Sequence, residues 1–334
     1  MSDSEAMGLS ANENRVAVVL VNYHSEDYLR ECLAALAHQS RPPDRVIVVD
    51  NGSNQARLAE VLSSYPVAEL LRMPDNVGFS PGNNRAVERI TDCRWIVLLN
   101  VDTIAEPDWL QNLLDAASRH PDCAFFGSLL MIANSSGIID GTGDVYHCSG
   151  RHWRRDHGAP AAQMHHATEE TIAPCAAAAM YRYDAWLAVG GFDEDFVCYS
   201  EDVDLGLRLV LSGHAYRHVP ESVVHHIGSA VTRRHSQYYV YHGQRNLVWV
   251  YVKNMPGYLF WKYLPQHLLF NFLACGWFIL HGRGLTVLRA KWDAVRGLPR
   301  VWRQRRLLQK NRKLPVSDFD ARLAHGIRRL LRGS

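Results

Sequence analysis

The most concentrated chemistry in this 334-residue chain lies in a short acidic segment, residues 193–204. It holds six carboxylates, and no Lys or Arg between Gly190 and Leu207 neutralises them: Asp193, Glu194, Asp195, Glu201, Asp202 and Asp204. Ser200 stands where a helix cap is expected, so residues 201–211 are predicted to form a helix that starts with three of these acids. Acids are common at helix starts because the helix dipole stabilises a negative charge there. A cleft lined this way either binds a metal ion or removes a proton.

The elements that must position these acids alternate between apolar runs and helical patterns from residue 15 onwards. Continuous apolar runs are typical of strands that are covered on both faces. Strands are predicted at 16–21, 46–49, 68–71 and 95–99, helices at 28–37, 55–63, 82–90 and 109–118, and loops or a small antiparallel excursion at 134–171. The predicted fold class is α/β, a doubly wound and mostly parallel sheet with helices on both faces, followed by a C-terminal helical appendage.

Polar residues follow the predicted strands, at the edge where parallel sheets bind ligands. They are Asn22 and Tyr23, Asp50 and Asn51, and the run Asn100, Val101 and Asp102. A dehydrogenase places its ribose-binding acid as Asp50 is placed, but residues 22–26 lack the Gly-x-Gly-x-x-Gly turn. Asp50 could instead bind a nucleobase or ribose, or only form a turn.

Two further features of this edge point to a diphosphate. Asp102 could hold a divalent cation, which a diphosphate needs, or cap the helix that follows Pro107. Residues 76–80 lead into a helix and are expected to offer free backbone N–H groups to an anion.

Six segments in this order resemble glycosyltransferase family 2, and most closely its bacterial rhamnosyltransferase-like branch. They are residues 21–25, 49–53, 76–79, 99–102, 190–194 and 201–205. The resemblance covers about residues 15–255. It implies a GT-A fold, a nucleotide-diphosphate sugar donor, a divalent cation (Mg²⁺ or Mn²⁺) and inversion at the anomeric carbon.

The resemblance also implies roles for single residues. Donor-nucleotide positions are Asn22, Tyr23, Asp50, Asn51, Asn76, Gly78, Phe79, Asn83, Asn100, Val101 and Asp102. Asp102 matches the last acid of the family's Asp-x-Asp metal motif, in which Asn100 replaces the first acid. His226, two residues before Gly228, matches the family's metal-binding His better than His225 does.

The acidic segment then takes catalytic roles by the same resemblance. Asp202 matches the second acid of the family's Glu-Asp-x-Asp segment, which is the general base. Glu201 is expected to assist catalysis, and Asp193 and Asp204 to line the acceptor side.

The cysteines and the N-terminal residues indicate the cellular compartment. Seven cysteines, none in a Cys-x-x-Cys pair, favour free thiols in a reducing environment. Residues 1–14 are polar and are expected to be disordered, with no signal peptide, so we expect the catalytic part to be cytoplasmic.

The C-terminal part is basic and aromatic. Residues 283–334 carry fifteen Lys and Arg against three Asp, a net charge of +12. Residues 257–281 are apolar, but Lys262 and Pro265 interrupt them, and Phe272–Leu280 is shorter than the about 20 residues that a bilayer core requires. We expect an amphipathic, basic helical region that lies on the anionic inner face of the cell membrane. The alternatives are a packed appendage or a homodimer contact; no nucleic-acid motif accompanies it.

The predicted organisation is a catalytic domain over 15–255 and the C-terminal region over 256–334. The first divides into a nucleotide-sugar half (15–125) and an acceptor half (126–255). The implied function is transfer of L-rhamnose from dTDP-rhamnose to a lipid-linked or polysaccharide acceptor in cell-envelope glycan synthesis. Alternatives are UDP-galactofuranose, UDP-GlcNAc or UDP-galactose as donor, or a non-catalytic, sugar-nucleotide-binding membrane scaffold.

Overall fold

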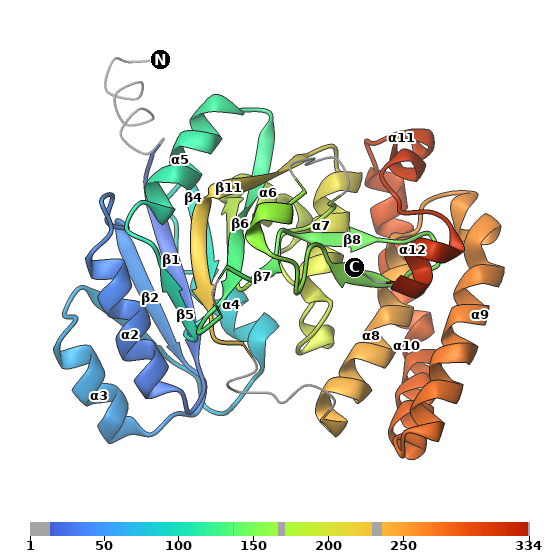
Figure 1. Ribbon diagram of the computed structural model, residues 1–334, viewed down its shortest axis with the longest axis horizontal. Helices are drawn as coiled ribbons and strands as arrows, with labels where there is room; N and C mark the ends of the chain where they lie inside the picture. The colour runs from blue at the N-terminus through green and yellow to red at the C-terminus, as the bar shows by residue number, and fades with distance from the viewer. Residues whose placement is uncertain (1–13, 136, 166–170, 229–235, 333–334) are drawn as a thin grey trace.

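The computed structural model describes residues 14–332 except 136, 166–170 and 229–235. Figure 1 shows a central sheet between layers of helices, with further helices gathered beside it toward the C-terminus. The disorder expected for residues 1–14 lies outside the described residues, apart from Asn14.

All the strands and helices predicted before residue 120 are present, with shifted ends. The strands are β1 (Val16–Asn22), β2 (Arg45–Asp50), β3 (Ala68–Arg72), β4 (Trp95–Leu99), β5 (Thr103–Ala105), β6 (Cys123–Ile132), β7 (Ile139–Gly141), β8 (Asp144–Tyr146), β9 (His152–Arg154), β10 (Ala178–Arg182) and β11 (Ala215–His226). The α-helices are α2 (Glu26–Ala37), α3 (Gln55–Ser63), α4 (Phe79–Val87), α5 (Trp109–Arg119), α6 (Tyr183–Val189), α7 (Glu201–Leu211), α8 (Gln237–Asn254), α9 (Leu259–Leu280), α10 (Gly284–Asn311), α11 (Val316–Ala321) and α12 (Ile327–Arg332). Short 3-10 turns lie at η1 (Ala161–Gln163) and η2 (Glu194–Phe196). Helix α4 begins before Pro81 because proline is tolerated in a first helical turn.

The strands of the central sheet run in the order β3-β2-β1-β4-β10-β6-β11-β5, with β7 added to β6. The first four of these strands are parallel to one another. Strand β10 is antiparallel to both of its neighbours, and β11 is parallel to β6. The expected antiparallel excursion is the hairpin of β8 and β9.

Successive residues of β1 enter two separate hydrophobic cores. Val18 belongs to the core that contains Leu29 of α2, and Val19 to the core that contains Ala86 of α4 and Leu205 of α7. All these side chains are almost fully buried. The sheet is therefore covered on both faces, as its continuous apolar strands predict. All seven cysteines are free thiols, also as predicted.

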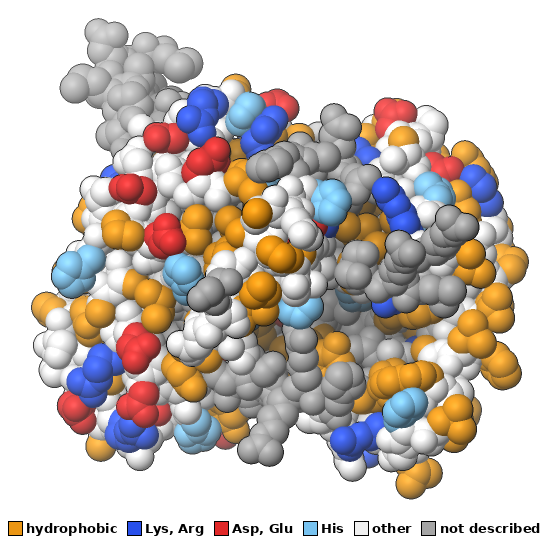
Figure 2. Space-filling model, viewed as in Figure 1, with side chains coloured by type: hydrophobic (Ala, Val, Ile, Leu, Met, Phe, Trp, Pro, Cys, Tyr) orange, Lys and Arg blue, Asp and Glu red, His pale blue; other side chains and the backbone are white. Residues whose placement is uncertain are grey.

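Helix α9 is continuous over its 22 residues, so it is longer than the uninterrupted apolar run Phe272–Leu280 on which the sequence expectation was based. Pro265 lies inside this helix, where it cannot donate a helical hydrogen bond. By length and composition alone, α9 is long and apolar enough to cross a membrane. Hydrophobic side chains gather along the edge of the molecule that α9 and α10 form (Figure 2). The strongly exposed apolar residues there are Trp261, Leu268, Leu269, Phe272, Leu273, Leu280, Leu285, Leu288, Trp292 and Val295.

Candidate active site

The carboxyl ends of β1 and β2 bring Asn22 and Asp50 together, because the parallel strands pair these two residues in register. Ser53 links them. Its hydroxyl accepts a hydrogen bond of 2.7 Å from the Asn22 amide, and its backbone N–H donates one of 2.8 Å to Asp50. Burial alone would raise the pKa of Asp50, but hydrogen bonds from Ser53 and Gln55 hold that pKa below its ordinary value. Asp50 is thus a fixed, charged group at the sheet edge.

A second pair of amide side chains holds the loop that leads into α4. Asn51 Nδ2 donates to Asn76 Oδ1 over 2.8 Å, and Asn51 Oδ1 accepts from the Val77 N–H over 2.9 Å. Asn76 also accepts from the N–H of Gly78, whose φ of 96° is a conformation that favours glycine. Three of the predicted donor residues therefore form one hydrogen-bonded unit.

The start of α4 does not offer the free N–H groups that we expected. The backbone N–H groups of Phe79 and Ser80 donate to the carbonyl of Val197, over 3.1 and 3.3 Å. A Cβ on Gly78 would lie 2.9 Å from the Val197 side chain, so the two loops meet closely. The tertiary contact uses the donors that an anion would need, and it brings the acidic segment to the donor side.

Four other predicted donor residues differ in how far they reach the surface. Asn83 is buried and donates to the Phe79 carbonyl within α4, and the buried Val101 side chain packs in the core. Asn83 and Val101 can therefore act only by packing or through their backbones. Tyr23 and Asn100 are half-buried at the strand ends, where a ligand could contact them.

His226 lies beside Asp102, as the resemblance implies. The pairing of β11 with β5 sets His226 opposite Thr103, the residue after Asp102. His226 Nε2 is 3.5 Å from Asp102 Oδ1. His225 points the other way, with its Nε2 3.1 Å from Glu106 on the surface. The geometry selects His226 of the two histidines.

The pair formed by Asp102 and His226 fits a divalent cation that a substrate diphosphate helps to hold. Within the described part of the chain, no three His, Cys, Asp or Glu side chains gather closely enough to hold a metal by themselves. Mg²⁺ is usually bound by one or two protein groups together with substrate phosphates and water, and imidazole suits Mn²⁺ as well. The side chains of Asp102 and His226 at the sheet edge fit this mode of binding.

Sequence reasoning missed Asp140, which lies with Arg154 on the far side of His226. Asp140 Oδ2 lies 2.7 Å from His226 Nδ1, and Arg154 forms an ion pair with the same carboxylate. Burial would lower the pKa of His226, but hydrogen bonds to Asp102 and Asp140 raise it to about 9. Asp140 is the middle residue of β7, a strand of only three residues, which is too short for a periodic pattern to reveal.

Three carboxyl groups meet at the start of α7. Glu201 and Asp144 are buried, and Asp202 is half-buried. Burial, and then the charge of Asp202, raises the pKa of Asp144 to about 7 and that of Glu201 well above its ordinary value. Asp202 is held by the backbone N–H groups of Val203 and Ala176, over 2.8 and 3.3 Å. Of the three, Asp202 is the most exposed.

The turn before α7 is strained and is held from outside. Val197, Tyr199 and Ser200 all have left-handed backbones, with φ between 65° and 70°. We predicted that Ser200 caps the helix, but its side chain makes no capping hydrogen bond. Its hydroxyl instead pairs with His152 Nε2 at 2.9 Å. Asn246 of α8 donates to the carbonyls of Cys198 and Tyr199 and so holds the turn. Strain of this kind collects at functional sites.

Asp193 and Asp204, the predicted acceptor-side acids, face Lys253. Lys253 Nζ lies 2.7 Å from Asp193 and 2.9 Å from Asp204. Asp204 has no exposed surface, and Arg208 and Asn254 also bind its carboxylate. Its effect on the acceptor can only be indirect, through the position of α7.

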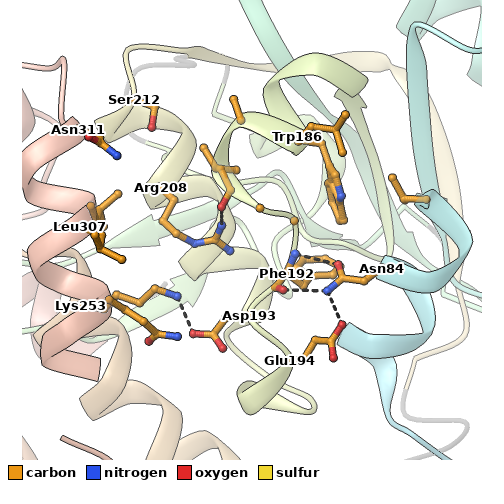
Figure 3. A pocket seen from close by; sticks show the side chains of 18 of the residues that line it. Asn84, Trp186, Phe192, Asp193, Glu194, Arg208, Ser212, Lys253, Leu307 and Asn311 are labelled. Carbon is orange, nitrogen blue, oxygen red and sulfur yellow. Dashed lines mark hydrogen bonds and ion pairs between the residues drawn. The ribbon is translucent and has the colours of Figure 1, made fainter. Parts of the chain in front are cut away.

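Asp193 instead lines a cavity of about 630 Å³ between α4, α6, α7 and α10. Figure 3 shows Arg208 between Leu307 of α10 on one side and Trp186 on the other, with Asp193 and Lys253 below it. The lining includes neither Asp102 nor Asp202. The cavity therefore lies apart from the candidate site at the sheet edge.

Residues 17–186, about half of the chain, match the sequence model of glycosyl transferase family 2. The chain belongs to glycosyltransferase family 2. It is therefore a glycosyltransferase, and the resemblance read from its six segments is confirmed.

One relative of this glycosyltransferase is the N-acetylglucosaminyl-diphospho-decaprenol L-rhamnosyltransferase of Mycobacterium tuberculosis (strain ATCC 25618 / H37Rv). The two are 28% identical over 262 residues, 70% of this chain and 85% of the relative. The O-antigen biosynthesis protein RfbC of Myxococcus xanthus is 26% identical over 60% of this chain, which matches only 16% of that longer protein.

Solved structures share the fold of the enzyme. TarS 1–349 of S. aureus, in complex with UDP, has a TM-score of 0.57 and 17% identity, and the match covers 92% of this chain and 89% of that one. The mannosyltransferase PcManGT of Pyrobaculum calidifontis, with GDP-Man and Mn²⁺, has a TM-score of 0.52 and 16% identity, over 89% and 84% of the two chains. The predicted GT-A fold is confirmed.

Proposed function

We propose that the enzyme transfers L-rhamnose from dTDP-rhamnose to a lipid-linked or polysaccharide acceptor, with inversion at the anomeric carbon. The observation that carries this proposal is the similarity to the L-rhamnosyltransferase over 70% of the chain. That relative acts, by its name, on a sugar linked through diphosphate to decaprenol. A lipid-linked acceptor and a role in cell-envelope glycan synthesis follow by analogy.

Asp202 is the proposed general base. It removes the proton of the acceptor hydroxyl while that oxygen forms its bond to the anomeric carbon and the bond to the diphosphate breaks. The half-buried position of Asp202, beside the buried Glu201 and Asp144 whose pKa values are raised, supports this role. Glu201 then donates a hydrogen bond that orients the acceptor or the base.

Asp102 and His226 would hold Mg²⁺ or Mn²⁺, which supplies positive charge to the departing diphosphate. The Mn²⁺ in the structure of PcManGT supports this choice. The nucleotide would lie along the ends of β1, β2 and β4, against Asn22, Tyr23, Asp50, Asn51, Asn76, Gly78, Phe79, Asn83, Asn100 and Val101. In this proposal residues 15–125 bind the donor and residues 126–255 bind the acceptor. Asp193 and Asp204 stabilise the wall of the acceptor site.

A panel of donors tests the sugar assignment. Thermal shift and released nucleoside diphosphate are measured with dTDP-rhamnose, UDP-galactofuranose, UDP-GlcNAc and UDP-galactose, with and without Mn²⁺ or Mg²⁺. We expect metal-dependent turnover of dTDP-rhamnose. Turnover of a UDP-sugar alone would change the donor, and binding without turnover of any sugar would favour the scaffold.

We also propose that residues 256–334 hold the enzyme on the cytoplasmic face of the cell membrane. The exposed apolar residues of α9 and α10 lie beside exposed basic ones, which suits an anionic leaflet. Four of the exposed basic side chains of α10 recur every seven residues: Arg289, Arg296, Arg303 and Lys310. Co-sedimentation with phosphatidylglycerol vesicles should exceed that with phosphatidylcholine vesicles. A homodimer in light scattering without vesicle binding would assign the surface to a second copy instead.

A further inference from the structure

Asp140 is a buried carboxylate surrounded by three basic side chains. Its Oδ2 lies 2.7 Å from His226 Nδ1 and also forms an ion pair with Arg154. Its Oδ1 lies 3.2 Å from His157 Nδ1. The residue is only 6% exposed, so protein groups rather than bulk water satisfy the carboxylate.

The sheet directs the Asp140 side chain by a β-bulge. Ile139 pairs with Met131 and Gly141 pairs with Leu130, so Asp140 is the extra residue opposite two consecutive positions of β6. A bulge changes the direction of a side chain and is frequent beside active sites. On the other edge of β6, strand β11 ends at His226. The bulge thus turns Asp140 toward the end of β11.

Arg154 fixes the charge and position of Asp140 from the hairpin of β8 and β9. A Cβ on Gly141 would lie 2.2 Å from Arg154 side-chain carbons, so the glycine is what allows the arginine to lie against β7. Arg154 also donates to Cys175 Sγ over 2.9 Å, which holds its other nitrogen. The carboxylate that faces His226 is therefore itself held on both sides.

This contact sets the chemistry of the histidine ring. When Asp140 accepts a hydrogen bond from Nδ1–H, the lone pair of the neutral ring is on Nε2. Nε2 is the nitrogen that faces Asp102, at 3.5 Å. A histidine that binds a metal usually donates its other N–H to such a carboxylate, which fixes both tautomer and ring orientation.

We propose that Asp140 is a positioning residue that holds His226 in the orientation and tautomer needed to bind a divalent cation beside Asp102. This inference rests on the proposed function, because it assumes that His226 is a cation ligand. It adds a residue that lies outside the six segments by which the family was recognised.

The test measures Mn²⁺ binding directly, by the electron paramagnetic resonance signal of free Mn²⁺ in the presence of dTDP, so that no turnover is needed. Asp140→Ala should weaken Mn²⁺ binding by about 10-fold to 100-fold, the usual effect of losing such a partner. Asp140→Asn keeps an oxygen that can accept from Nδ1–H, so it should restore much of the affinity. His225→Ala, next in sequence and turned to the surface, should bind as the unchanged protein does.

The outcomes separate this inference from the proposed function. If His226→Ala binds Mn²⁺ as the unchanged protein does, the cation site itself is wrong and the role of Asp140 falls with it. If His226→Ala loses binding but Asp140→Ala does not, only the role of Asp140 is overturned. Should Asp140→Ala not fold, ¹⁵N NMR of the histidines in the unchanged protein decides. A His226 that does not carry its proton on Nδ1 in the Mg²⁺ complex overturns the inference.

Discussion

Lys253 Nζ lies 2.9 Å from Asp204 Oδ2, and the two side chains are only 5% and 0% exposed. Arg208 and Asn254 complete the shell around the carboxylate, at 2.7 and 2.8 Å. Burial alone would raise the pKa of Asp204, but Lys253 and Arg208 hold that pKa below its ordinary value. The pair joins α8 to the first turn of α7, which also carries Asp202.

Asp204→Ala should lower the free energy of unfolding by about 3 kcal/mol, because it leaves buried cations without their counter-charge. Urea unfolding followed by circular dichroism measures this difference. Asp184→Ala is the matched control, since its ion pair with Arg182 is at the surface and is worth less than about 1 kcal/mol. Equal losses in the two variants would contradict the structural role of Asp204.

Asp202→Asn should reduce kcat by about 10²-fold to 10⁴-fold while nucleotide binding persists, because only the base is removed. Glu201→Gln should keep far more activity, since burial raises the pKa of Glu201 and so favours its neutral form, which glutamine imitates. Released nucleoside diphosphate and isothermal titration with dTDP give the two readouts. Near-normal turnover in Asp202→Asn would exclude it as the base.

Asp102→Ala should weaken nucleotide binding only when Mn²⁺ is present, because the carboxylate acts through the cation. Titration of dTDP with and without Mn²⁺ measures the metal-dependent part of the affinity. Glu106→Ala, which removes the surface partner of His225, is the control. An unchanged metal-dependent gain in Asp102→Ala would remove this residue from the site.

His267 should make the fold sensitive to acid. Burial lowers its pKa from 6.5 to about 4, and its ring bridges the Ser149 carbonyl and Asn271. Between these two pKa values the unfolded chain binds a proton that the folded chain does not, so stability falls as the pH drops through that window. Urea midpoints across the window should fall less steeply for His267→Gln. Equal slopes in both proteins would refute this contribution.

The N-terminal half of the fold could be predicted from the sequence because its strands are buried on both faces and read as unbroken apolar runs. The small strands could not be predicted in this way. β7, β8 and β9 have three residues each, too few for a periodic pattern. Their pairing depends on long-range contacts, such as the bridge from Asp144 to Ala173, which local sequence does not record.

The acids of residues 193–204 were expected to line one cleft, and the structure divides them. Residues two apart on a helix point about 200° from each other, so Asp202 and Asp204 face opposite sides of α7. That difference could have been read from the helix prediction itself. The partner of Asp204, Lys253, could not, because it comes from another helix.

Asp140 shows where sequence reasoning ends. Its role depends on a bulge and on the glycine that follows it, and both are defined only once β7 pairs with β6. The prediction of free N–H groups at the start of α4 was wrong for a similar reason. The carbonyl of Val197, which is distant in sequence, already accepts hydrogen bonds from them.

The alternation along β1 has a consequence for how this enzyme can change over generations. The register that sends Val18 and Val19 into different cores also sets Asn22 opposite Asp50. A one-residue insertion or deletion in β1 would exchange the contents of both cores and move Asn22 away from its partner at once. Substitutions of similar size can accumulate in this strand, whereas a change in its length would remove folding and donor recognition together.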